Sequence, residues 1–222
     1  MPALPRILIT AGPTREPIDA VRYVSNRSSG RLGLAIAHAT AERGVPTTLL
    51  LGPIDGPADC SSHIGLRRFQ STADLQTQLH LHWPEHDLLI MAAAVADYRP
   101  VNPSTGKMRR VGSPCRIELE PTPDLLAEAA SNARPEQRLV GFALEPTDRL
   151  AESASTKLHR KGVHAIVANP LETMDSPDIA ATIYSSQVEP IATPARLSKA
   201  EFADWLLDQL AGLFNLNIPL RM

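Results

Sequence analysis

One stretch near the amino terminus, residues 7–33, constrains the fold of this chain more than any other. It begins with an apolar, β-type run, Ile7–Thr10, continues through a long polar loop, and enters a helix at Ser28-Ser29-Gly30. A strand, a loop and a helix amino terminus in that order form an anion-binding corner, because first-turn N–H groups lack intrahelical partners and the helix dipole adds positive charge. The loop is about twice as long as a dinucleotide-binding turn and carries Arg15, Glu16, Asp19, Arg22, Asn26 and Arg27. We therefore expect the corner to bind a charged, hydrogen-bonding substrate as well as a phosphate.

Strand-like and helix-like segments alternate along the chain. The run Leu88–Ala93 is apolar throughout, which is typical of a central strand in a parallel sheet. Capping boxes at Ser71–Asp74 and Ser198–Glu201 predict the starts of two helices that end near Trp83 and Leu213. The order predicts an α/β fold, a doubly wound and mostly parallel sheet with helices on both faces. Further strands are expected at 6–11, 47–51, 64–69, 117–119, 139–143 and 165–168, helices at 29–43, 124–130 and 148–161, and a hairpin from 182–184 and 188–191.

Composition places the chain in an ordinary globular class. Its 222 residues, of which 43% are hydrophobic, fit a single domain over residues 1–222. The formal net charge of −2 gives no bulk reason to expect nucleic acid as a partner. No apolar run approaches the ~18 residues that a membrane-spanning helix needs, and the first six residues do not resemble a signal peptide. We therefore expect no membrane partner and a cytoplasmic location.

The segment 98–114 interrupts this regularity. It holds three prolines, two glycines and the cations Lys107, Arg109 and Arg110, with almost no apolar periodicity. A loop this long inside a compact domain is usually functional or disordered. Cations on a loop that can close would suit a polyphosphate, so we predict a flexible lid, although an ordinary surface loop has the same composition.

Three other clusters fall where such a sheet places its ligand, outside the carboxyl ends of the strands. The opening corner is the first. The second is Ala92–Asp97, whose small side chains let a ligand lie against the backbone and whose Asp97 can accept hydrogen bonds or help to hold a metal. The third is Gly141-Phe142-Ala143 with Lys157 and Lys161, which are four apart and therefore share one helix face. Tight packing alone would account for an alanine run, and a solvent-exposed helix face would account for a lysine pair. The hypothesis of a ligand site therefore rests on the expectation that all these clusters lie at one edge of one sheet.

Two further groups are weaker candidates. The cluster His80, His82 and His86 has partly metal-like spacing, but it lies near a helix end, far from the expected ligand edge. Cys115 has no histidine arranged to activate it as a nucleophile.

At these motifs the sequence resembles the phosphopantothenate–cysteine ligase family of coenzyme A biosynthesis. The resemblance covers residues 6 to about 170 and includes several long motifs in order, Thr10–Asp19, Val21–Gly30, Ala92–Pro100, Thr122–Asp124, Val140–Ala143 and Lys157–Asn169. It implies a modified Rossmann-like fold and a homodimer with sites near the dimer interface. It also implies that a nucleoside triphosphate activates the carboxylate of 4′-phosphopantothenate as an acyl-nucleotide, releasing pyrophosphate, before the amine of L-cysteine displaces the nucleoside monophosphate. In a monofunctional bacterial-type member, CTP is the expected nucleotide, and Mg²⁺ is expected mainly on the triphosphate, with its protein ligands unknown.

The family's site residues map onto this sequence residue by residue. By this resemblance Asn26 and Lys107 are catalytic, Asn26 at the developing carbonyl charge and Lys107 in the lid. Substrate binding falls to Arg22, Ser28, Ser29, Gly30 and Ala93, and nucleotide binding to Gly12, Ala92, Ala93, Asp97, Lys107, Phe142, Lys157 and Lys161. The chain departs from the family pattern in the lid, which reads Lys107–Arg110 where many relatives are lysine-rich, and in residues 170–178, which lack the usual Gly-Phe turn.

Two rival functions remain. A nicotinamide-dependent oxidoreductase shares this fold class. However, the loop after the first strand lacks the Gly-x-Gly-x-x-Gly motif, and no Tyr-x3-Lys dyad follows the strand Leu88–Ala93. A regulatory nucleotide-binding module would need no second ligand pocket, whereas the polar loop indicates one.

Overall fold

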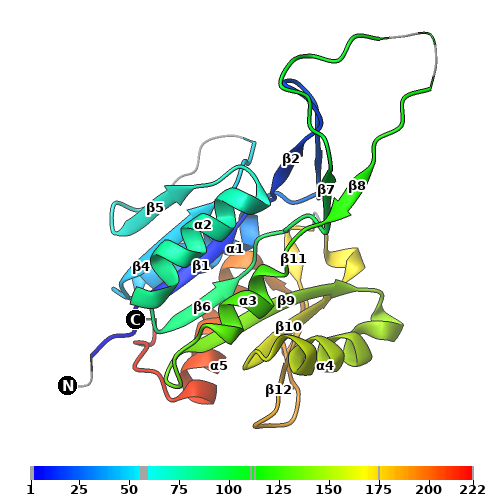
Figure 1. Cartoon of the computed structure of the whole chain (residues 1–222). Coiled ribbons are helices and arrows are strands. Elements are labelled where there is room, and N and C mark those ends of the chain that lie inside the picture. Colours follow the sequence, from blue (N-terminus) through cyan, green and yellow to red (C-terminus); the bar gives the residue numbers. More distant parts are fainter. Residues whose placement is uncertain (1–2, 56–59, 111, 113, 175, 222) are drawn as a thin grey trace.

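An eight-stranded sheet forms the centre of the computed structural model, which describes residues 3–55, 60–110, 112, 114–174 and 176–221 (Figure 1). The strand order is β13-β12-β10-β9-β6-β1-β4-β5, and the six strands from β10 to β5 are parallel. Only β12 and β13, at one edge, run antiparallel to their neighbours. The bounds are β1 Ile7–Ala11, β4 Thr47–Leu51, β5 Ile64–Arg68, β6 Leu88–Met91, β9 Arg138–Glu145, β10 Ala165–Pro170, β12 Thr182–Ser185 and β13 Ile191–Ala192.

Helices cover both faces of the sheet, and each face has its own core. On one face α1 (Arg31–Glu42) and α5 (Lys199–Phe214) pack on alternate residues of the strands, among them Ile7, Ile9 and Ile90. On the other, α2 (Thr72–His82), α3 (Leu125–Ser131) and α4 (Leu150–Lys161) pack on the intervening residues, such as Leu8 and Leu89. This period of two gives the strands burial on both sides. The predicted α/β, doubly wound, Rossmann-like fold is confirmed.

The order of the strands fixes where a ligand can lie. From β1 the chain proceeds outward to β4 and β5, then crosses to β6 on the other side of β1 and continues to β9 and β10. The strands β1 and β6 therefore flank a topological switch point, where the loops that leave their carboxyl ends diverge and open a crevice.

Most predicted elements are present with small changes in their bounds. Both capping boxes exist, with Ser71 and Asp74 opening α2 and Ser198 and Glu201 opening α5. The first helix begins at Arg31, two residues later than expected, because Gly30 is its N-cap in the left-handed conformation (φ 70°). Short 3-10 turns follow or precede three elements, η1 Trp83–Glu85, η2 Thr147–Arg149 and η3 Leu171–Thr173.

Three small two-stranded sheets lie outside these predictions. The loop after β1 contains the hairpin β2 (Arg15–Pro17) and β3 (Tyr23–Ser25). The bounds of the strand expected at 117–119 were wrong, since β8 is Leu119–Pro121. It pairs with β7, Tyr98–Pro100, which lies in the segment 98–114 that was expected to be irregular. This pairing joins the two ends of a long arm that projects from the body of the molecule (Figure 1). The third pair is β11 (Asp178–Ile179) with β14 (Leu197–Ser198).

Some expectations fall on residues outside the described part. These residues include Val111 and Ser113 of the predicted lid, Asp175 in the segment 170–178 that differs from the family pattern, and the first two residues of the chain. Within the described ranges, no helix is both long and apolar enough to cross a membrane.

Candidate functional site

A cavity of about 860 Å³ opens at the carboxyl ends of the central strands, at the switch point between β1 and β6. Its walls come from the loop before α1, the segment after β6, the start of α3, the middle of β9 and one face of α4. Ten of the thirteen residues expected in the site line it: Asn26, Ser28, Ser29, Gly30, Ala92, Ala93, Asp97, Phe142, Lys157 and Lys161. The other three, Gly12, Arg22 and Lys107, do not line it in this single chain.

Glycine allows the corner at the start of α1 to close tightly. A Cβ on Gly33 would lie 2.4 Å from the Cβ of Ala11, so the first turn of α1 lies directly against the end of β1. A Cβ on Gly30 would lie 2.8 Å from Ile54 Cγ2 and 3.3 Å from Gly12 Cα. Gly12 itself has φ 80° and turns the chain out of β1. Gly12 therefore shapes the corner from behind, while Gly30 presents the helix amino terminus to the cavity.

Hydroxyl groups from β1 and the turn after it hold the segment that follows β6. Thr10 Oγ1 accepts a hydrogen bond from Ala93 N at 3.1 Å, and Thr14 Oγ1 accepts one from Ala96 N at 3.0 Å. Both threonines are fully buried. Because the Ala93 N–H is engaged in this way, Ala93 presents its carbonyl group and small side chain to a ligand. The sequence analysis missed both threonines, although a hydroxyl residue inside an apolar strand was a visible signal for Thr10.

Asn26 joins the two loops that form the floor of the cavity. Its Nδ2 donates to the carbonyl of Val95 at 2.9 Å. A side-chain amide carries two N–H groups, so the bond to Val95 fixes the amide while a second donor remains for a ligand. A donor fixed in this way needs no reorganisation when charge develops on a neighbouring oxygen.

Both lysines of α4 line the cavity, and each is held by a carboxylate. Lys157 Nζ lies 2.8 Å from Glu145 Oε1, which also accepts from Ser153 Oγ at 2.9 Å. The hydrogen bond from Lys157, helped by the bond from Ser153, lowers the pKa of Glu145. Glu145 is therefore the partner of a lysine that lines the cavity.

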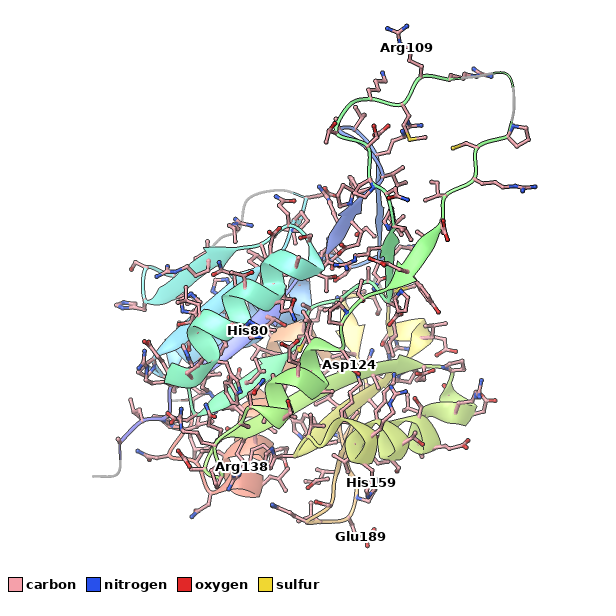
Figure 2. The ribbon with its side chains drawn as sticks, viewed as in Figure 1. His80, Arg109, Asp124, Arg138, His159 and Glu189 are labelled. Atoms are coloured by element: carbon pink, nitrogen blue, oxygen red, sulfur yellow. The ribbon has the colours of Figure 1, made fainter. Side chains whose placement is uncertain are left out.

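The second pair involves the start of α3. Lys161 Nζ lies 3.0 Å from Asp124 Oδ1, and the same oxygen caps α3 by accepting from Ala127 N at 3.2 Å (Asp124 is labelled in Figure 2). Burial acts to raise the pKa of Asp124, but the bonds from Lys161 and the Ala127 N–H outweigh it, so that the pKa is lowered. Arg160 also lines the cavity and was missed by the sequence analysis. This wall thus presents three cations to a polyanion.

A second hollow, of about 590 Å³, lies on the other side of the loop 25–29. It is lined by three arginines, Arg15, Arg27 and Arg31, and by Tyr23, over whose ring the Arg15 guanidinium lies at 4.6 Å. Residues 25–29 and Arg31 line both spaces, so Asn26 lies at the boundary between the cavity, with the cations of α4 on its wall, and an arginine-rich hollow that Arg15 also lines. Planar guanidinium groups bind phosphate in a bidentate manner.

The predicted lid stands away from the cavity in this chain. Figure 2 shows Arg109 near the far end of the arm, remote from Asp124. Arg22, expected at the substrate phosphate, donates instead to the carboxylate of Asp19 and to the carbonyl of Met108 in the arm.

The histidine cluster does not converge on one point. His80 Nε2 lies 2.6 Å from Glu128 Oε1, whereas His86 is bound to the carbonyl of His82 and to Thr48 Oγ1. Among the described residues, no group of three or more histidine, cysteine, aspartate or glutamate side chains could hold a metal ion. The segment 170–178, which differs from the family pattern, still reaches the cavity through Thr173 and Met174, and Asn169 just before it also lines the cavity.

This fold and site define a class of doubly wound α/β proteins with a cation-lined cavity at the switch point of the sheet and a second, arginine-lined hollow beside it. Residues 3–213 match the family model described as "DNA/pantothenate metabolism flavoprotein C-terminal domain", and the chain belongs to that family. The resemblance inferred from the sequence, to the ligase family of coenzyme A biosynthesis, is thereby confirmed at the level of the family.

Individual relatives agree with this assignment. The "Coenzyme A biosynthesis bifunctional protein CoaBC" of Mycobacterium bovis is 40% identical over 173 residues, covering 74% of this chain and 41% of the relative. Its Vibrio cholerae counterpart is 37% identical over 187 residues, covering 81% and 46%. A protein from an unknown prokaryotic organism named "Cysteine/Cysteine sulfinic acid decarboxylase" is 43% identical over 167 residues, covering 75% and 46%. The chain spans about half the length of the curated relatives it matches.

Solved structures show the same fold. The crystal structure of the C-terminal domain of CoaBC is 36% identical with a TM-score of 0.80, and the match covers 95% of this chain and 96% of that one. A Cab2 mutant in complex with phosphopantothenate-cysteine is 16% identical with a TM-score of 0.76, covering 95% and 88%, which shows the fold alone.

Proposed function

We propose that this domain is a phosphopantothenate–cysteine ligase that joins 4′-phosphopantothenate and L-cysteine, with CTP as the activating nucleotide. The observation that carries the proposal is the placement of Asn26 at the boundary between two cation-lined spaces, the cavity with Lys157, Arg160 and Lys161 on its wall and the arginine-rich hollow. A ligase of this kind must hold two anionic substrates so that a carboxylate of one meets the α-phosphate of the other. The relatives named as coenzyme A biosynthesis proteins support a reaction in that pathway.

In this proposal the nucleotide occupies the cavity at the switch point. The ring of Phe142 lies against the base, and Lys157, Arg160 and Lys161 neutralise the phosphates. The phosphate of 4′-phosphopantothenate enters the hollow beside Arg15 and Arg31, with Ser28, Ser29 and the amino terminus of α1 at the boundary between the two spaces. The pantothenate carboxylate then reaches Asn26.

Two displacements complete the reaction. The carboxylate oxygen attacks the α-phosphorus of CTP, the bond to the β-phosphate oxygen breaks, and pyrophosphate leaves. The cysteine amine then attacks the carbonyl of the acyl-cytidylate, an amide forms, and CMP leaves with the bond electrons while the amine gives up a proton. Asn26 donates to the carbonyl oxygen as charge develops, and the chain supplies positioning and charge neutralisation rather than a covalent intermediate.

Mg²⁺ fits this site as a companion of the triphosphate. Magnesium is commonly bound through one or two carboxylates together with substrate phosphates, and Asp97 offers an exposed carboxylate on the cavity wall, whereas Asp124 is engaged by Lys161. When bound, the ion would neutralise phosphate charge and make pyrophosphate a better leaving group.

We also propose that the working form is a homodimer and that Lys107 acts from the arm. The arm projects from its own chain (Figure 1), so that Lys107 reaches bound nucleotide by closure of the arm or across a dimer interface. The role of Lys107 is to neutralise the triphosphate as charge moves onto pyrophosphate.

The experiment that tests the proposal is mass-spectrometric detection of phosphopantothenoylcysteine after incubation with 4′-phosphopantothenate, L-cysteine, Mg²⁺ and either CTP or ATP. The proposal predicts product with both substrates present and a faster rate with CTP. Faster product formation with ATP would overturn the nucleotide assignment alone. Tight CTP binding without product from either nucleotide would overturn the ligase and leave a binding module.

A further inference from the structure

The arm is fastened to the β2–β3 hairpin at Met108 through one buried carboxylate. Asp19 lies in the turn of the hairpin, and its side chain has no exposed surface. Its Oδ1 accepts from the N–H groups of Val21 and Arg22 at 2.8 and 2.7 Å. Its Oδ2 accepts from Arg22 Nε at 3.0 Å, from Arg22 Nη2, and from the N–H of Met108 in the arm at 3.0 Å.

Arg22 closes the same contact from the other side. Its Nη2 donates to the carbonyl of Met108 at 3.1 Å, so the peptide groups on both sides of Met108 are bound, the N–H by Asp19 and the C=O by Arg22. Ser104 N donates to the carbonyl of Ile18 at 2.9 Å and adds a second point of attachment four residues earlier. Figure 1 shows β2 and its hairpin standing beside the base of the arm.

This arrangement is more than a hairpin turn needs. The two Oδ1 bonds to Val21 and Arg22 already form a local turn of the type that aspartate makes with the backbone two and three residues on. One of the bonds to Oδ2, that from the N–H of Met108, instead reaches across 89 residues to the arm. The charged bond from Arg22 lowers the pKa of Asp19 well below its ordinary value, so the carboxylate keeps its charge throughout the neutral range.

The consequence concerns Lys107, which directly precedes Met108. We propose that Asp19 and Arg22 are positioning residues that fix the backbone of Met108 and thereby determine where Lys107 is presented to bound nucleotide. This inference rests on the proposed function for the role of Lys107, but the clasp itself, Asp19–Arg22–Met108, does not. It also gives Arg22 a role other than direct contact with the substrate phosphate, since Arg22 lines neither the cavity nor the arginine-rich hollow.

The first test needs no substrate. The arm carries trypsin sites at Lys107, Arg109 and Arg110, so cleavage there reports on how firmly the arm is held around Met108. In Asp19→Asn we expect cleavage at least fivefold faster than in the wild type, with the thermal unfolding profile of the body retained. Glu136→Gln, which removes a carboxylate paired with Arg134 at 2.7 Å far from the arm, is the matched control and should leave the rate unchanged. An unchanged rate in a folded Asp19→Asn protein would overturn the clasp.

A second pair of variants approaches the clasp from the arm, in case the loss of a buried carboxylate prevents folding. Met108→Pro removes the N–H that binds Asp19, whereas Met108→Ala keeps both backbone groups. We expect faster cleavage after Arg109 and Arg110 in Met108→Pro only. Equal rates in the two variants would contradict the proposed hydrogen bond.

Kinetics then separate positioning from direct binding. If the clasp acts through Lys107, Asp19→Asn and Arg22→Gln should each lower kcat several-fold, the double variant should lose no more than either single variant, and neither should lower kcat further in a Lys107→Ala background. A rise in KM for 4′-phosphopantothenate in Arg22→Gln alone, with additive losses in the Lys107→Ala background, would restore the direct phosphate contact and overturn the inference. A wild-type protein that forms no product would refute the proposed function, and the proteolysis result would still decide the clasp.

Discussion

Lys161 Nζ lies 3.0 Å from an oxygen of Asp124 that also caps α3, so a cation on the cavity wall and the start of a helix are tied to one carboxylate. In the proposed function, a nucleotide phosphate that enters the cavity competes with this carboxylate for Lys161. The affinity for nucleotide is therefore the difference between two charge-assisted interactions, and changing either partner should alter it in a predictable direction.

Removal of Lys161 should weaken nucleotide binding. A hydrogen bond to a charged group contributes about 1.5–3 kcal/mol, so Lys161→Ala should raise KM for CTP by about ten- to a hundredfold with a smaller change in kcat. Steady-state kinetics with CTP as the varied substrate measures this. Arg134→Gln, at the amino end of β9 and away from the cavity, is the control cation. A CTP KM that is unchanged in Lys161→Ala would remove Lys161 from the nucleotide site.

Neutralising Asp124, the partner of Lys161, should strengthen nucleotide binding. Asp124→Asn keeps an oxygen that can cap α3 but no longer holds Lys161 by charge. We expect tighter binding of CTP, measured by isothermal titration, together with little change in Tm. Weaker binding would show that Asp124 supports the lysine in place rather than competing with the phosphate.

Loss of the arm cation should reduce turnover far more than folding. Lys107 is exposed, and its side chain adds no buried contact to the body of the molecule. We expect Lys107→Ala to lower kcat by at least tenfold with Tm unchanged, because the transition state loses a neutralising charge. An unchanged kcat would refute the lid as part of the machinery.

Two glycine substitutions test how closely α1 must approach β1. A Cβ on Gly33 would lie 2.4 Å from Ala11 Cβ, so Gly33→Ala must push the helix outward, at a cost of about 1–3 kcal/mol. In a domain of this size that corresponds to a fall in Tm of about 2–12 °C. Gly212 on α5 is the matched control, because a Cβ there meets nothing within 4 Å and alanine should stabilise the helix by about 0.5–1 kcal/mol. Equal Tm values for the two variants would contradict the predicted packing at Gly33.

A buried histidine should make stability depend on pH. His86 is 2% exposed, and burial lowers its pKa. In the unfolded chain this histidine takes up a proton near pH 6.5, whereas in the folded chain it does so only at lower pH. The free energy of unfolding should therefore be highest above pH 6.5 and should decrease as the pH falls below that value. For one group the decrease is at most about 1.4 kcal/mol per pH unit. Denaturant titrations from pH 8 to pH 5 measure this slope, which should be shallower in His86→Asn. Part of the slope should remain in His86→Asn, because burial also lowers the pKa values of His82 and His164. The same slope in both proteins would exclude His86 as a contributor.

The sequence predicted the fold well because the local signals agree with the tertiary arrangement. The run Leu88–Met91 is apolar throughout and lies in the middle of the sheet, between β1 and β9. Both capping boxes combine a hydroxyl side chain with a carboxylate three residues later, which satisfies two helix N–H groups by local bonds alone. Such features do not depend on distant residues, so they can be recognised in sequence.

What the sequence did not predict depends on distant partners. The pairing of β7 with β8 joins segments about twenty residues apart, and Arg99 and Glu120 form an ion pair directly across it. The carboxylates that hold Lys157 and Lys161 come from β9 and from the start of α3. Arg22 was assigned to a substrate phosphate from its motif, whereas in the structure it binds Asp19, three residues earlier, and Met108, which comes from the arm 86 residues later.

The measurement that tests the central claim most directly is a quenched single-turnover experiment with CTP and 4′-phosphopantothenate in the absence of cysteine. The account predicts about one pyrophosphate released per active site, only when 4′-phosphopantothenate is present, followed by release of CMP when cysteine is added. Absence of pyrophosphate from both CTP and ATP in a folded protein, or release that does not require 4′-phosphopantothenate, would contradict it.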